Sequence, residues 1–193
     1  MGHQPYRHNA KVMERRSYDP EIPAVTVVTS VHRLTHDGFM YHISGKVTGF
    51  ANAATDDFLI VAPPEKEGHI IDFNLTMGRG DIDIVTYEGT TTSNDGTPLQ
   101  SEVFNTNRNS TNTPLQTLFS DPTITDVGTL IHTSWMPPTS TGTGQSASGF
   151  VGGGQGEEWT IVPAEKYLMR ITNNSGSTID YRYEFKWYEA DYT

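Results

Sequence analysis

The segment Ile179–Tyr188 reads IDYRYEFKWY, and its pattern decides the fold of the chain. Its odd-numbered positions up to 187 are apolar or aromatic, and the even-numbered positions from 180 to 186 are charged. Because successive side chains of a β-strand point to opposite faces, this pattern predicts a half-buried antiparallel strand. A helix would scatter the same aromatic side chains around its axis. Burial of the five odd-numbered side chains is expected to contribute roughly 1.5–3 kcal/mol each, with the charged face in solvent.

Similar patterns recur along the chain and predict roughly ten short strands. Alternating or continuous apolar runs occupy positions 24–28, 39–48, 58–61, 71–75, 81–84, 100–104, 115–119, 127–133, 159–162 and 166–172. The run at 58–61 is uninterrupted, which predicts a strand covered on both faces. The turn Met77–Gly80 is expected to join its flanking strands as a hairpin, and the Gly-, Ser- and Thr-rich segment Pro137–Gly156 is expected to be a long surface loop. No segment has a convincing helical period.

These strands predict an all-β fold, a two-layer antiparallel sandwich, for which a jelly roll is our first choice of topology. A chain of 193 residues suits one all-β domain. We expect residues 24–193 to form that single domain. Residues 1–23 have neither a strand period nor a helix period, and we expect them to form an extended basic N-terminal arm. The absence of cysteine excludes disulfides, thiolate catalysis and cysteine-based zinc sites.

Charge is unevenly distributed along the chain. Residues 1–16 carry four basic side chains and one acidic side chain, a net charge of +3, whereas the rest of the chain carries 9 basic and 22 acidic side chains, a net charge of −13. The acidic balance argues against general nucleic-acid binding. No apolar run approaches the roughly 18 residues of a membrane span, and no hydrophobic signal core is present, so we expect no membrane contact.

The predicted arm has two interpretations. It is either a frayed terminus or a segment that becomes ordered on a neighbouring subunit or on another protein. In the second interpretation, its aromatic and basic side chains anchor it to the partner. These partner-binding candidates are Tyr6, Arg7, Lys11, Arg15, Arg16 and Tyr18.

Candidate metal ligands and catalytic groups have simpler explanations. His32, His36 and His42 come closest to a metal cluster, but a spacing of four suits a helix and this segment is strand-rich, so we expect no metal and no cofactor. Asp81 and Asp83 share one face of a predicted strand about 7 Å apart, which is compatible with glycosidase carboxylates or calcium ligands. A solvated strand face explains this aspartate pair better, and nothing in the sequence argues for an enzyme.

Five stretches resemble those of a family of small virion proteins from tailed bacteriophages. They are THDGFMYHISGKVTG (Thr35–Gly49), GDIDIVTYEGTTTSNDGTP (Gly80–Pro98), FNTNRNSTNT (Phe104–Thr113), SDPTITDVGTLI (Ser120–Ile131) and YLMRITNNSGSTIDYRYEFKWYE (Tyr167–Glu189). The resemblance implies a head decoration (cement) protein with a jelly-roll-like β-sandwich. Such a protein would bridge neighbouring major capsid proteins and stabilise the head against packaged DNA. The family brings no catalytic residues, and the predicted arm lies outside these stretches.

The resemblance also implies partners and a location. We expect contacts with the major capsid protein and with further copies of the chain, as a homodimer or homotrimer, but not with nucleic acid or a membrane. The expected location is the outer capsid surface of the virion, after synthesis in the host cytoplasm.

Two other functions remain open. One is a carbohydrate- or receptor-binding sandwich, such as a head fibre or a tail-associated adhesin, which would bind a glycan through exposed aromatic side chains. The candidates for this role are Tyr41, Tyr87, Trp135 and Tyr188. The other is a glycoside hydrolase that uses the aspartate pair.

Overall fold

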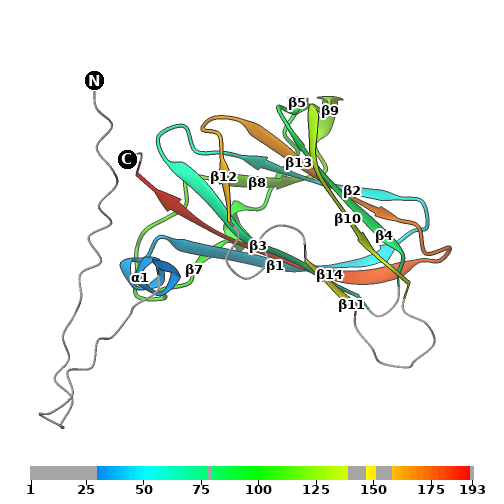
Figure 1. Cartoon of the computed structure of the whole chain (residues 1–193), viewed down its shortest axis with the longest axis horizontal. Helices are drawn as coiled ribbons and strands as arrows, with labels where there is room; N and C mark the ends of the chain where they lie inside the picture. The colour runs from blue at the N-terminus through cyan, green and yellow to red at the C-terminus, as the bar shows by residue number, and fades with distance from the viewer. Residues whose placement is uncertain (1–29, 78–79, 139–146, 151–157, 192–193) are drawn as a thin grey trace, which may run out of the picture.

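A computed structural model describes residues 30–77, 80–138, 147–150 and 158–191 of the chain. Almost all regular structure in these residues is β, in antiparallel sheets that pack as a sandwich (Figure 1). The predicted all-β, two-layer antiparallel fold is therefore confirmed. The predicted arm and the first predicted strand, 24–28, lie outside the described residues.

The first sheet contains six strands, and the last described strand of the chain lies near its centre. The order is β11 (Ala147–Phe150), β3 (Glu67–Met77), β14 (Ile179–Ala190), β1 (Met40–Phe50) and β7 (Phe104–Asn105), and β12 (Trp159–Ile161) also pairs with β3. β14 pairs with β3 on one side and with β1 on the other. The strand predicted at 179–188 is thus confirmed as the middle of this sheet.

The second sheet also contains six strands and packs against the first. The order is β10 (Thr129–Met136), β4 (Ile82–Glu88), β13 (Lys166–Asn173), β2 (Thr55–Val61), β8 (Thr117–Ser120) and β6 (Thr97–Pro98). A separate ribbon of β5 (Thr91–Asn94) and β9 (Thr123–Asp126) is tied to β13, where Lys166 Nζ donates to Thr92 Oγ1 (2.8 Å). Phe58, Leu59 and Ile60 of β2 are all buried, which confirms the prediction of a strand covered on both faces.

Strand pairs in the sandwich are nested along the chain. β1 pairs with β14, β2 with β13, β3 with β11 and β12, and β4 with β10. Consecutive strands from β1 to β4 therefore alternate between the two sheets. The predicted hairpin through Met77–Gly80 is wrong, because β3 and β4 lie in different sheets. Alternation identified each as a half-buried strand, but the two bury their apolar faces in one core from opposite sides.

Aromatic side chains of β14 fill the middle of that core. Its five odd-numbered side chains from 179 to 187 are at most 8% exposed. The ring of Trp187 lies 5.7 Å from that of Tyr41, and the ring of Phe185 lies 6.1 Å from that of Phe73. On the outer face, Asp180 pairs with Lys46 of β1 at 2.8 Å. This pair is intramolecular and exposed, so Asp180 has a partner within its own sheet.

Three regions differ from the prediction. The segment 100–104, predicted as a strand, contains a 3₁₀ helix, η1 (Gln100–Glu102), and only its last residue belongs to a strand, β7. Ser30–Asp37 forms a helix, α1, where no helix was predicted. Its end is held by side chains from a distant loop, since Asn107 Nδ2 donates to the His36 carbonyl (2.8 Å) and Asn112 Nδ2 donates to the Gly38 carbonyl (3.2 Å). Eight residues are too few for a clear period, and these contacts are invisible in the local sequence. The predicted loop Pro137–Gly156 contains a short strand, β11.

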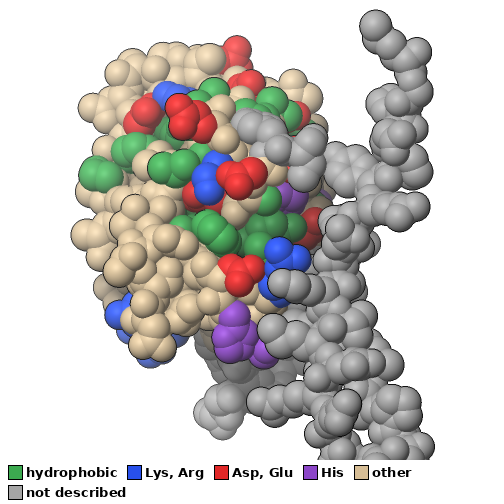
Figure 2. Space-filling view, turned by 90° about the vertical axis from the view of Figure 1, so that its left-hand side faces the viewer, with side chains coloured by type: hydrophobic (Ala, Val, Ile, Leu, Met, Phe, Trp, Pro, Cys, Tyr) green, Lys and Arg blue, Asp and Glu red, His purple; other side chains and the backbone are tan. Residues whose placement is uncertain are grey.

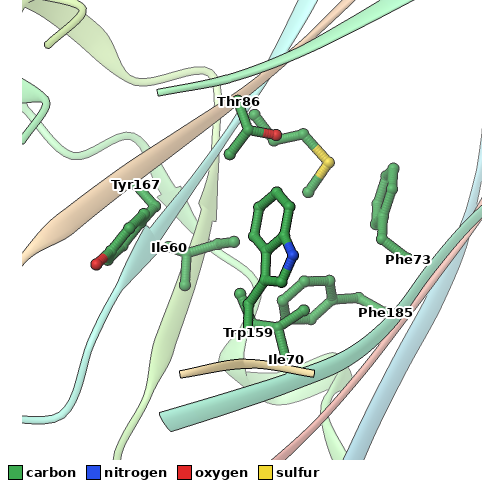
Figure 3. Close-up of a pocket in the computed structure, with 8 residues that line it drawn as sticks. Ile60, Ile70, Phe73, Thr86, Trp159, Tyr167 and Phe185 are labelled. Atoms are coloured by element: carbon green, nitrogen blue, oxygen red, sulfur yellow. The ribbon is translucent and has the colours of Figure 1, made fainter. Parts of the chain in front are cut away.

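The interior of the sandwich leaves almost no empty space. A cavity of about 20 Å³ lies between the sheets, which is room for about one water molecule. Trp159 of β12 lies at the centre of this region, with Thr86 on one side and Ile70 and Phe185 on the other (Figure 3). Nearly all of the lining is apolar, so this cavity is a packing gap without room for a substrate.

Candidate binding surfaces

The sandwich has two ends that differ in structure (Figure 1). At one end, here called the helix end, α1 precedes the start of β1 at Met40, and β14 finishes at Ala190. At the opposite end, here called the tryptophan end, β10 finishes with Trp135 and Met136 beside the start of β4. The turn between β13 and β14 lies at the same end, because the register pairs Asn173 with the first residue of β4.

Exposed aliphatic side chains mark the helix end. Leu115 is 47% exposed and Val162 is 51% exposed. The ammonium group of Lys66 lies 5.1 Å from the centre of the Phe39 ring and pairs with Asp191 (3.4 Å). Figure 2 looks onto this end and shows apolar side chains interspersed with acidic and basic ones. The exposed apolar side chains of this end therefore lie among charged groups, some of which pair with one another.

A buried carboxylate positions Leu115. Glu189 is only 2% exposed, and its two oxygens accept hydrogen bonds from the backbone N–H groups of Leu115 (2.9 and 3.0 Å) and Gln116 (2.8 Å). Together with burial, this carboxylate raises the pKa of Tyr41 to about 12. Sequence reasoning missed Glu189, although it continues the odd-numbered, inward-facing positions of β14. A charged residue in an inward position was the available signal.

A second polar cluster lies on the outer face of the first sheet. The His69 and Tyr188 rings stack in parallel with centres 4.3 Å apart, and the Tyr188 hydroxyl donates to Glu158 (2.8 Å). Burial, followed by this bond, raises the pKa of Tyr188 above its usual range. Because Tyr188 is 8% exposed and Tyr41 is 2% exposed, neither offers a ring face to a glycan, and Tyr87 is half-buried.

Trp135 is the candidate aromatic that is open to solvent. Its side chain is 59% exposed, and its indole N–H donates to Asp81 Oδ1 (2.6 Å). Asp83 is the cross-strand partner of Trp135 and accepts a hydrogen bond from Asn174 Nδ2 (2.7 Å). The Asn174 backbone N–H donates to the Asp81 carbonyl (2.7 Å), which fixes the turn to the start of β4. The fold thus brings together Trp135 and the aspartate pair, which the sequence analysis treated as separate candidates.

The tryptophan end carries local negative charge. No ion pair joins Asp81 or Asp83 to a lysine, arginine or histidine of the described residues. Each carboxylate instead contacts its own neutral neighbour, Trp135 or Asn174. Both groups therefore retain free lone pairs that can accept hydrogen bonds from a ligand.

The predicted histidines do not converge. His32 and His36 lie one turn apart in α1, with ring centres separated by 4.5 Å. His42 lies in β1, where its Nε2 is 2.8 Å from Glu184 and burial is the main cause that lowers its pKa. Within the described residues, no group of three or more His, Asp or Glu side chains is arranged to hold a metal ion. The arm candidates Tyr6, Arg7, Lys11, Arg15, Arg16 and Tyr18 lie outside the described residues.

Comparisons with known proteins leave the chain unassigned. No protein-family model matches the sequence, and no curated protein matches it. In the described part of the chain, no helix is long and apolar enough to span a membrane.

Proposed function

We propose that this protein is a structural virion component that binds the outer surface of a phage capsid through its helix end. It holds neighbouring major capsid proteins together and so stabilises the head. The proposal begins from the five stretches that resemble head decoration proteins, which extend from residue 35 to residue 189. It assigns no catalysis to the chain.

The observation that carries the proposal is the surface of the helix end. Leu115 and Val162 are exposed by 47% and 51%, while Glu189 holds the Leu115 loop in place. Exposed apolar side chains on a fixed backbone favour a protein contact, because little conformational freedom is lost on binding. The predicted basic arm lies N-terminal to α1 in the sequence, and in this proposal the arm and the aliphatic surface bind one partner together. Two linked contacts bind more tightly than either contact alone.

The strand order supports the jelly-roll topology that we propose for the sandwich. A jelly roll contains eight main strands in two Greek keys, as if one long antiparallel hairpin were rolled up. The nested pairs from β1 with β14 to β4 with β10 match that description. The jelly roll is common in viral capsid and lectin domains, which supports a binding role without specifying one.

A reconstitution experiment tests this function. Heads of the phage that encodes the chain, prepared without it, are incubated with the purified protein, and bound protein is measured after sedimentation. We expect saturable binding and a higher temperature of DNA release. A complete lack of binding to heads overturns the proposal.

Variants identify the surface that binds. Removal of residues 1–23 is expected to lower occupancy at least tenfold, and the double variant Leu115→Ser, Val162→Ser is expected to lower it further. Ala51→Ser, at an exposed position that follows β1 at the opposite end, is the control and is expected to bind like the parent. Full occupancy without residues 1–23 would exclude the arm from binding.

A further inference from the structure

We propose that the tryptophan end binds a neutral saccharide, with Trp135 as the stacking surface and Asp81, Asp83 and Asn174 as hydrogen-bonding groups. This is an additional function, and it does not depend on capsid attachment at the helix end.

Trp135 has the exposure that stacking requires. The chain has three tryptophans; Trp187 is fully buried, Trp159 is half-buried in the core, and Trp135 is 59% exposed. An indole ring that is mostly in solvent leaves a large, rigid apolar surface available for contact. The C–H face of a sugar ring is apolar and flat, so an open indole can contact it while the sugar hydroxyls remain available for hydrogen bonds.

The indole is already oriented before a ligand binds. Its N–H group donates to Asp81 (2.6 Å), and the backbone of Asp81 is held by the N–H group of Asn174 (2.7 Å). A fixed ring loses little side-chain entropy on binding. A tryptophan that served only as a loose surface residue would need no such partner.

Two carboxylates lie next to the exposed ring on the neighbouring strand and its preceding turn. Asp83 is the cross-strand partner of Trp135, and Asn174 Nδ2 donates to Asp83 (2.7 Å). An ionised carboxylate offers about four lone-pair positions, of which each aspartate uses few in the described contacts. Sugar hydroxyls are donors as well as acceptors, so they match the remaining lone pairs of both carboxylates.

Charge selects the class of saccharide. Neither aspartate forms an ion pair with a described basic side chain, and the whole chain has a net charge of −10. Two carboxylates without a basic partner among the described residues repel uronic acids, sialic acids and sulfated sugars at short distance. A neutral hexose chain avoids this repulsion and is therefore the favoured ligand.

Titration with defined oligosaccharides tests the inference. The intact protein is titrated with maltohexaose, cellohexaose and mannohexaose, and with hexagalacturonic acid as the acidic comparison, by calorimetry and tryptophan fluorescence. We expect at least one neutral hexamer to bind with a Kd at or below about 1 mM and to change the fluorescence, and the acidic hexamer to bind at least tenfold more weakly. If none of the three neutral hexamers binds at 10 mM, the inference is wrong.

Three variants measure how much the indole ring, the aspartate charge and an exposed aliphatic residue of β10 each contribute to binding. Trp135→Ala is expected to weaken binding at least tenfold, whereas Ile131→Ala, at a 41% exposed position of the same strand, should leave the Kd unchanged. Asp83→Asn removes one charge and is expected to narrow the difference between the neutral and acidic hexamers. Parent-like binding by Trp135→Ala contradicts the inference, and circular dichroism verifies that each variant is folded.

The same variant distinguishes this function from capsid attachment. Trp135→Ala is expected to occupy heads like the parent, because its surface lies at the opposite end from α1 (Figure 1). Loss of head occupancy in Trp135→Ala would overturn the assignment of capsid attachment to the helix end, whereas the titrations above decide the saccharide inference.

Discussion

The helix end and the tryptophan end both expose apolar side chains, but in different electrostatic surroundings. At the helix end, Leu115 and Val162 are aliphatic, and nearby charges pair with each other, as Lys66 does with Asp191. At the tryptophan end, the exposed group is aromatic, and the two aspartates beside it have no basic partner among the described residues. Neutralised charges around aliphatic groups suit a large protein contact, whereas free acceptors around an indole suit a small ligand rich in hydroxyls.

The largest expected difference is in stability, when Trp187 near the helix end and Trp135 at the tryptophan end are each replaced by alanine. Trp187 is fully buried close to Glu189, whereas Trp135 is mostly exposed. Trp187→Ala is expected to lower the free energy of unfolding by about 3–5 kcal/mol through loss of packing and creation of a cavity. Trp135→Ala should lower it by less than about 1 kcal/mol. Urea denaturation measures both values, and equal losses would show that Trp135 has a structural role.

Glu189→Ala should act on the helix end alone. The substitution leaves the buried N–H groups of Leu115 and Gln116 without their acceptor, which is expected to cost about 1–3 kcal/mol of unfolding free energy. It should also lower head occupancy, because the Leu115 loop is released, while saccharide binding stays unchanged. Glu102→Ala, at an exposed position, is the control and is expected to change stability by less than about 0.5 kcal/mol. Unchanged stability in Glu189→Ala would mean that water replaces the carboxylate.

Protonation of His42 at acidic pH should change the free energy of unfolding least of all. His42 lies near the start of β1, and burial lowers its pKa in the folded chain below the value of about 6.5 in an unfolded chain. The unfolded state therefore takes up the proton first, so the contribution of His42 to stability is present above about pH 6.5 and is lost as the pH falls below it. His42→Gln should reduce the loss of stability between pH 7.5 and 5.5. Urea denaturation of the parent and of His42→Gln at both pH values measures this difference, and an equal loss of stability in the two proteins would contradict the assignment.

Local periodicity predicted most of the strands, because the buried and exposed faces of a strand appear directly in its alternation of apolar and polar residues. Ile179–Tyr188 and the run at 58–61 were identified from single segments, and the sandwich followed from the number of such segments. The partner of each strand was not predictable in this way. The assumed hairpin through Met77–Gly80 failed because adjacent strands with the same alternation can lie in one sheet or face each other across a core.

The candidate sites were predictable only in parts. Trp135 and the aspartate pair were each noted, but their contact depends on the pairing of β10 with β4, which no local pattern encodes. Glu189 was not predicted to be buried, because the alternation of apolar side chains in β14 ends at Trp187 and a glutamate in the next inward position gives no apolar signal. Helix α1 was missed because Asn107 and Asn112, which hold its end, lie some seventy residues away.

The central place of β14 determines when the fold can be completed during synthesis. The strand lies between β3 and β1, so the first sheet stays divided until residue 190 has left the ribosome. Until then, β1 and β3 each present an unpaired edge to other chains. Folding must wait for contacts between distant parts of the chain, which is typical of slow, milliseconds-to-seconds folding of β-sandwiches. A chain that lacks β14 would therefore leave the facing edges of β1 and β3 exposed and prone to aggregation.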